Sequence, residues 1–293
     1  MHADATFHFY AIGTKWQIDL FSTPPKLHLD SLRERIQRRV AIFEENYSRF
    51  RPDSFLSKST RQSGSFLLPD DAKPLFDIYL KLYELTDGAF TPLIGGTLED
   101  AGYNADYTLK PKQSIYSPKS WNEILEYCYP RLTIKEACTL DFGAAGKGYT
   151  IDIVSDMLRQ AGISFFTVEA GGDIRFDSPD QTLRVGLEHP KKAGEEIIGV
   201  ATIQNLSICG SAGNRRSWGS FHHIINATTL RSPTDVLATW VAAKDTLTAD
   251  ALATALFLVP PQRLTSTFSF EYVIVYDNFS ADISRGFPGE IFT

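Results

Sequence analysis

The chain has 293 residues, of which 43% are hydrophobic and 22% charged, and its mean hydropathy is -0.15. That length allows one large or two modest domains with a buried core. The net charge is -6 and the Lys and Arg residues are scattered, which argues against nucleic-acid binding. No apolar run of about 18 residues and no signal-peptide pattern occurs, so we expect a soluble, cytoplasmic protein without membrane insertion.

The three cysteines are Cys128, Cys138 and Cys209. Their number is odd, and their spacing does not match that of metal ligands. A disulfide framework or a cysteine zinc site is therefore not expected, and we interpret all three as free thiols, buried in the fold.

Apolar residues at helical spacing predict four helices. The first is expected to start with a capping box at Ser31 and Glu34, and the third to end with Gly162 as its C-terminal cap. The second helix is expected to begin just after Asp70 or Asp71 and to end near residues 87–88. The third is expected at about residues 149–160, and the fourth is expected to start near Thr248.

Apolar runs, several alternating with period two, predict strands at residues 7–12, 16–20, 165–168, 183–187, 197–203 and 272–275. These strands occur in pairs as well as beside helices, which favours an α+β fold over a doubly wound parallel sheet. No linker composition interrupts the chain, so we predict a single domain over residues 1–293. Residues 103–130 are rich in turn formers and are predicted to be an irregular excursion of that domain.

A glycine-rich segment at residues 141–148, Asp-Phe-Gly-Ala-Ala-Gly-Lys-Gly, precedes the third predicted helix. Small residues allow close approach of the backbone, and Lys147 adds a positive charge, as in a phosphate-binding loop at a helix start. The pattern differs from a P-loop because Gly148 follows the lysine. A tight strand-to-helix turn explains the segment equally well.

Residues 169–173, Glu-Ala-Gly-Gly-Asp, follow a predicted strand. The paired glycines suggest a backbone pressed against a ligand, with Asp173 free to accept hydrogen bonds. An ordinary β-turn with Asp in its usual place is the alternative.

Asp250 and Thr254 lie four residues apart and therefore on one face of the fourth predicted helix. A carboxylate beside a hydroxyl is a pair of hard oxygen ligands suited to Mg²⁺. The alternative is an Asp that interacts favourably with the helix dipole and a Thr that only packs.

A further polar cluster comprises residues 209–216 and 222–226. Its Ser211, Gly213 and paired arginines are suited to a phosphate or a flavin edge. A histidine beside them is suited to accept a proton from an attacking hydroxyl. Since adjacent residues of a strand face opposite sides, only one of His222 and His223 is expected to take part.

Taken in order, these segments resemble the FAD:protein FMN transferases of the ApbE type, from Gly13 to about Val259. Residues 141–149 are similar to the family's D-L-G-G-I-[AG]-K-G-Y, and residues 170–174 are similar to A-G-G-D-I. The other matching segments are residues 13–16, 47–57, 86–95, 211–216, 223–225 and 249–255. Several motifs in one order are far more specific than any of them alone. The family resemblance implies an α+β domain with antiparallel or mixed sheets flanked by helices.

The resemblance also implies roles for individual residues. It places Mg²⁺ on Asp250, Thr254 and the backbone carbonyl of Gly146. It gives catalytic roles to Asp250, to Lys147 opposite the pyrophosphate, and to His223, which matches the histidine of H-I-I-D-P. The residues implied to bind FAD are Ile12, Ser48, Phe50, Ala89, Phe90, Asp141, Lys147, Gly171, Gly172, Asp173, Ser211 and Gly213.

The implied reaction is phosphoryl transfer that depends on Mg²⁺. A Thr or Ser hydroxyl of an acceptor flavoprotein attacks FAD, FMN becomes attached through a phosphoester, and AMP leaves. The same residues fit an FAD pyrophosphatase, in which water replaces the hydroxyl, or a flavin-binding protein without turnover. Both expected side-chain ligands of the metal are present, which favours catalysis.

The sequence departs from the family pattern at three places. Ile12 stands where the family has Met, and Thr91 stands where it has Asp. His223 is followed by Ile-Ile-Asn-Ala-Thr-Thr-Leu instead of I-I-D-P-x-T-G. Because an Asp and a Pro are lost, we expect the turn after His223 to be built differently.

Overall fold

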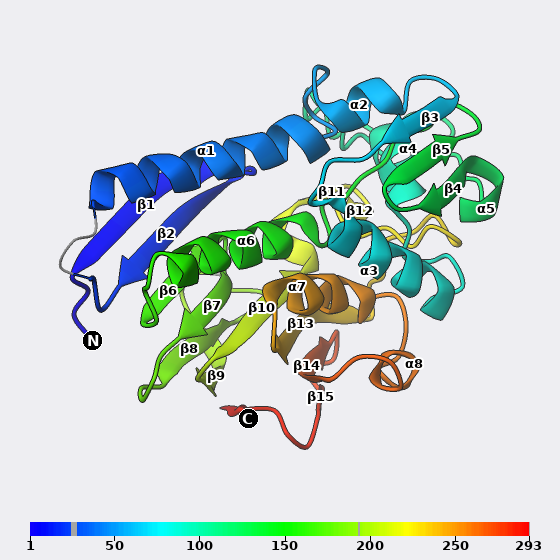
Figure 1. Cartoon of the computed structure of the whole chain (residues 1–293). Coiled ribbons are helices and arrows are strands. Elements are labelled where there is room, and N and C mark those ends of the chain that lie inside the picture. Colours follow the sequence, from blue (N-terminus) through cyan, green and yellow to red (C-terminus); the bar gives the residue numbers. More distant parts are fainter. Residues whose placement is uncertain (25–27, 193, 293) are drawn as a thin grey trace.

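The computed structural model describes residues 1–24, 28–192 and 194–292. Its centre is an antiparallel sheet of eight strands in the order β1-β2-β6-β7-β10-β13-β14-β15 (Figure 1). The strands are β1 (Ala5–Ala11), β2 (Thr14–Leu20), β6 (Phe166–Ala170), β7 (Asp173–Asp177), β10 (Leu206–Ala212), β13 (Val236–Ala243), β14 (Phe270–Tyr276) and β15 (Ala281–Ile283). The alternation of apolar and polar residues along β2 places Trp16, Ile18 and Leu20 in the core.

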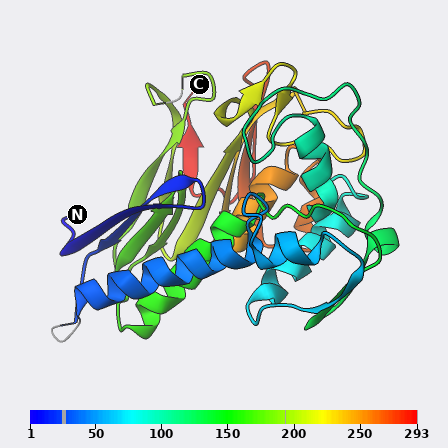
Figure 2. The same ribbon diagram turned by 90° about the horizontal axis from the view of Figure 1, so that it is seen from above.

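Three helices cover one face of this sheet, namely α1 (Leu29–Tyr47), α6 (Gly146–Gln160) and α7 (Thr246–Ala255). In the view from above, α1 and α6 run next to each other along the sheet (Figure 2). Leu32, Ile36 and Val40 form the apolar stripe of α1 and pack against the buried side chains of β2. The hydrophobic period of the sequence thus fixes which side of the helix faces the sheet.

The opposite face is covered by a second sheet in the order β16-β9-β8, formed by β8 (Leu183–Glu188), β9 (Ile197–Ile203) and β16 (Gly289–Ile291). Leu187 and Ile203 of this sheet share a buried cluster with Phe176 and Val273 of the large sheet. The middle strands of the large sheet, β7, β10, β13 and β14, are therefore buried on both faces, which explains why some of them are continuously apolar.

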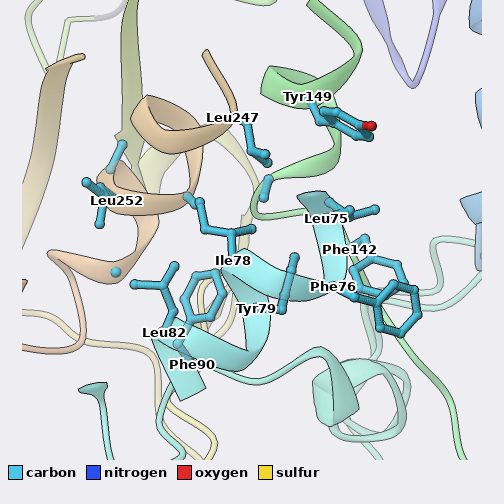
Figure 3. Close-up of a cluster of buried hydrophobic side chains, with 14 of the residues drawn as sticks. Leu75, Phe76, Ile78, Tyr79, Leu82, Phe90, Phe142, Tyr149, Leu247 and Leu252 are labelled. Carbon is cyan, nitrogen blue, oxygen red and sulfur yellow. The ribbon is translucent and has the colours of Figure 1, made fainter. Parts of the chain in front are cut away.

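A smaller region packs on the other side of α7. It contains α3 (Ala72–Leu85) and a sheet in the order β3-β5-β4. Leu75, Tyr79 and Leu82 of α3 join Leu247 and Leu252 of α7 in one buried cluster (Figure 3). The elements that complete this region and the loops are α2 (Phe55–Ser59), β3 (Gly64–Leu67), η1 (Pro92–Ile94), α4 (Gly95–Asp100), α5 (Trp121–Ile124), β4 (Leu125–Cys128), β5 (Arg131–Ile134), η2 (Gly213–Arg215), β11 (Ser217–Trp218), β12 (Phe221–His222) and α8 (Gln262–Thr265).

All four predicted helices are present, but some boundaries differ. The capping box at Ser31 is wrong, because α1 starts at Leu29 and its apolar face continues to that residue. The structure instead has a capping box at Ser120, whose backbone N–H and hydroxyl both donate to Glu123 Oε2 at 2.9 and 2.8 Å. The cap at Gly162 is confirmed by its φ of +80°. The helices α6 and α7 start at Gly146 and Thr246, earlier than expected.

The six predicted strands are present. The strands that were not predicted are β3, β4, β5, β7, β10, β11, β12, β13, β15 and β16. The prediction for residues 103–130 is wrong at its end, because residues 121–128 form α5 and β4.

Among the described residues, no helix is long and apolar enough to cross a bilayer. The cysteine prediction holds for Cys209, which is a buried free thiol, but Cys128 is exposed.

Candidate active site

A cavity of about 600 Å³ lies where the β1–β2 hairpin tip, the end of α1, the start of α6 and one face of α7 meet. Most of the residues predicted for the site line it: Ile12, Ser48, Phe50, Ala89, Phe90, Asp141, Gly146, Lys147, Gly171, Ser211, His223, Asp250 and Thr254. Gly172, Asp173 and Gly213 do not line it. The sequence separation of these segments shows that the cavity is assembled by the tertiary fold.

The start of α6 is packed tightly against α7. A Cβ added to Gly148 would lie 2.3 Å from the Thr246 carbonyl oxygen and 2.6 Å from Asp250 Cβ, so only glycine fits there. The Gly148 N–H donates to Asp250 Oδ2 at 2.8 Å. The carboxylate of α7 is thereby held at the positive end of α6, where helix dipoles favour a negative charge.

Lys147 links two acidic side chains at this wall of the cavity. Its ammonium contacts the buried carboxylate of Asp173 and lies 3.6 Å from Asp250 Oδ1. Burial raises the pKa of Asp250, and the nearby Lys147 counteracts that rise. Asp173 therefore acts on the cavity through Lys147.

The oxygen atoms around Asp250 have the chemistry that Mg²⁺ requires. Thr254 lies one turn further along the same face of α7, and its hydroxyl is 3.4 Å from that of Ser211. The Gly146 carbonyl accepts a hydrogen bond from the Thr150 hydroxyl at 2.7 Å. No group of three or more His, Cys, Asp or Glu side chains suited to a metal occurs in the described part of the chain. A set of one carboxylate, hydroxyls and a carbonyl fits a hard cation that retains some of its water ligands.

The two adjacent histidines have different environments. His222 Nε2 lies 2.8 Å from the Pro233 carbonyl and its Nδ1 accepts from the Ile224 N–H at 3.3 Å, which ties its ring into the surrounding loops. His223 instead lines the cavity, and its buried Nδ1 has no hydrogen-bond partner among the described residues. Burial and the nearby Arg216 lower the pKa of His223 to about 3, so its ring is neutral near pH 7.

Several lining residues were missed by the sequence analysis. Buried Arg49 forms an ion pair with Asp141 and donates to the Tyr103 carbonyl at 2.9 Å. Tyr103 also accepts, at its hydroxyl, a hydrogen bond of 2.9 Å from Arg216, which is one of the paired arginines of the predicted cluster. Phe50 stacks on Tyr107 with 5.6 Å between ring centroids. Arg49 lies between the predicted site residues Ser48 and Phe50, so its position in the sequence could have identified it. Tyr103 and Tyr107 lie in the predicted irregular excursion, where hydrophobic periodicity gives no signal.

Asn226 builds the turn after His223 without the proline of the family pattern. Its side-chain oxygen accepts from the Thr228 N–H and hydroxyl at 3.0 and 2.7 Å and from the Thr229 N–H at 3.2 Å. Leu230, where the pattern has glycine, adopts a φ of +59°. The side-chain oxygen of Asn226 thus shapes this loop, which has Ala227 where the pattern has proline.

The chain belongs to the ApbE family, whose sequence profile it matches over residues 12–272. Among curated relatives, the FAD:protein FMN transferase of Vibrio cholerae is 24% identical over 274 residues, which cover 86% of this chain and 80% of that protein. The FAD:protein FMN transferase of Treponema pallidum is 24% identical over 282 residues, which cover 85% of this chain and 76% of that protein.

Solved structures confirm the α+β fold. The flavin transferase ApbE from Vibrio cholerae superposes with a TM-score of 0.79 at 20% identity, covering 98% of this chain and 99% of that one. The ApbE protein from Thermotoga maritima superposes with a TM-score of 0.82 at 22% identity, covering 96% of this chain and 97% of that one. The family identified from the motifs is thus confirmed, together with its fold.

Proposed function

We propose that this protein transfers FMN from FAD to a Thr or Ser hydroxyl of an acceptor flavoprotein and releases AMP. The observation that carries the proposal is the junction of α6 and α7, which gathers Lys147, Asp250 and the hydroxyl of Thr254 on one wall of the cavity. A cation and hard oxygen ligands side by side suit a pyrophosphate with a bound metal ion. The names of the relatives supply the flavin as the substrate class.

Mg²⁺ would be held by Asp250, Thr254 and the Gly146 carbonyl, and when bound it would withdraw negative charge from the pyrophosphate. The ammonium of Lys147 stabilises the same negative charge of the pyrophosphate, and Asp173 holds that ammonium in place. Phe50 and Tyr107, which stack on each other, give the cavity an aromatic wall suited to a planar ring of the substrate.

In the proposed step, the acceptor hydroxyl oxygen bonds to the FMN-side phosphorus. The bond from that phosphorus to the bridging oxygen breaks, and the oxygen leaves with AMP. We assign the hydroxyl proton to the imidazole of His223, which lines the cavity and is neutral near pH 7. The product carries FMN through a phosphoester.

Incubation with FAD, Mg²⁺ and a flavoprotein that contains an Asp/Ser-Gly-Ala-Thr/Ser segment tests this proposal. We expect the intact mass of the acceptor to rise by one FMN residue while AMP appears in equal amount. The same acceptor with Ala in place of the Thr or Ser is the control and should stay unlabelled. AMP release without labelling would identify an FAD pyrophosphatase, and unchanged FAD would identify a binding protein.

A further inference from the structure

The tip of the β1–β2 hairpin forms one wall of the cavity. Ile12 and Gly13 make the two-residue turn between the strands, and both adopt left-handed backbone conformations, with φ of +52° and +68°. Glycine adopts this conformation freely, but a β-branched residue such as isoleucine does so at an energetic cost. The wall therefore includes a strained residue that other contacts must hold in place.

A carboxylate from a distant element holds this residue. The Ile12 N–H donates to Glu44 Oε1 at 3.0 Å, although the two residues are 32 positions apart. Glu44 lies in the last turns of α1 and itself lines the cavity. A hydrogen bond to an ionised acceptor is stronger than one between neutral groups, so this contact is well suited to offset the strain.

Other contacts hold the strand residues on either side of the turn. Trp16 Nε1 donates to the Ala11 carbonyl at 3.0 Å and fixes the strand side of the turn. A Cβ added to Gly171, which follows β6, would lie 2.6 Å from the Thr14 hydroxyl oxygen, so the β2 side of the turn is also closely packed. The Glu44 carboxylate is the contact that ties the tip itself to α1.

We propose that Glu44 is a positioning residue that sets the hairpin tip for substrate binding. Glu44 keeps Ile12, Gly13 and Thr14 at the cavity wall and thereby determines the affinity for FAD. This inference rests on the proposed function for the identity of the ligand. It assigns Glu44 no contact with the reacting atoms.

The dissociation constant for FAD, measured by quenching of flavin fluorescence with Mg²⁺ present, tests the role of Glu44. Glu44→Ala should weaken binding about tenfold, as expected for loss of a charge-assisted hydrogen bond. Glu44→Gln keeps an oxygen that can accept from Ile12 and should stay within about threefold of the wild type. Glu45→Ala is the matched control, because the half-exposed carboxylate of Glu45 has one ion pair in the described part of the chain, with exposed Arg38 at 3.8 Å.

A double-mutant cycle tests whether Glu44 acts through Ile12. Ile12→Gly removes the strain, so adding Glu44→Ala to it should weaken FAD binding less than about twofold further. Melting temperatures of all variants show whether the fold is retained. Equal effects of Glu44→Ala with Ile or Gly at position 12, or Glu44→Gln as weak as Glu44→Ala, would overturn the inference.

The measurement also separates this inference from the proposed function. A wild-type protein that binds FAD but labels no acceptor would contradict the transferase proposal, while the Glu44 variants would still report on positioning. A wild-type protein that fails to bind FAD would contradict both.

Discussion

Asp250 illustrates how one buried side chain combines structural and chemical demands. Its carboxylate accepts the Gly148 N–H and faces Lys147, and burial raises its pKa. These contacts satisfy part of its hydrogen-bonding capacity and leave the rest directed at the cavity. A residue in this position is suited to bind a cation without rearrangement of the fold.

We expect Asp250→Asn to reduce FMN transfer at least about 100-fold, because the charge that attracts the metal is lost. The amide oxygen can still accept from Gly148, so the melting temperature should change little. Initial rates of acceptor labelling over a Mg²⁺ series measure the effect. Asp180→Asn, an exposed control, should behave as wild type. Full activity of Asp250→Asn would refute the metal assignment.

His223→Ala should slow transfer about 100-fold while changing FAD affinity much less, because general bases contribute on this scale. Single-turnover labelling at saturating FAD separates the two effects. His8, exposed on β1, provides a histidine-to-alanine control. An unchanged single-turnover rate would remove His223 as the proton acceptor.

The same histidine has a pH signature. Its pKa is lowered to about 3 by burial, whereas an unfolded chain has the ordinary value near 6.5. Between these values the unfolded state binds more protons, so this residue lowers stability as the pH falls through 6.5. NMR of the ring in the free protein should show a neutral imidazole at pH 5; a protonated ring there would contradict the assignment.

At the scale of elements, the junction of α6 and α7 determines whether the site exists. Asp152 of α6 accepts hydrogen bonds from the first two N–H groups of α7, on Thr246 and Leu247, both at 2.8 Å. Gly148 allows the two helices to touch. The side chain and the glycine together fix where Asp250 lies relative to Lys147.

Gly148→Ala should therefore destabilise the protein by about 2 kcal/mol or more, since the added methyl group overlaps the backbone of α7. Urea unfolding measures the free energy of unfolding. Gly96→Ala is the control, because Gly96 lies in helix α4 and a Cβ there meets nothing within 4 Å. Similar stabilities of the two variants would show that α7 moves easily, against our interpretation.

Asp152 gives the junction its own pH dependence. Burial raises the pKa of this carboxyl to about 6, and the backbone hydrogen bonds only partly counteract the rise. The folded state holds the proton more tightly than the unfolded state between pH 4 and 6, so this group lowers stability as the pH rises through that range. The difference in unfolding free energy between wild type and Asp152→Asn, measured from pH 4 to 7, isolates this effect from that of His223. A constant difference would contradict the raised pKa.

At the scale of the molecule, periodicity and motif order predicted the fold class and most of the cavity. The four-residue spacing of Asp250 and Thr254 predicted that they share one face of a helix, and both lie on α7 and line the cavity. The contact between Lys147 and Asp173 was not predictable, because it depends on the pairing of β6 with β7 next to α6. Strands β10 and β13 were missed because burial on both faces removes the alternation of polar residues.

Features that depend on backbone conformation or on loop packing could not be predicted from the sequence either. Ile12 was predicted to bind FAD, but its left-handed conformation and its tie to Glu44 appear only in the folded chain. Tyr103 and Tyr107 belong to a segment without period, and only the tertiary fold brings them to Phe50. The sequence identifies chemical groups well where they lie on one regular element and poorly where loops bring them together.

The cavity has walls from widely separated parts of the chain, from Ile12 in the first hairpin to Leu258 just beyond α7. A nascent polypeptide in which α7 has not yet been synthesised lacks one of those walls and cannot enclose the dinucleotide. We therefore expect FAD to bind only after both of these parts of the chain have folded. Ligand protection against proteolysis should extend to the two ends of the sequence together.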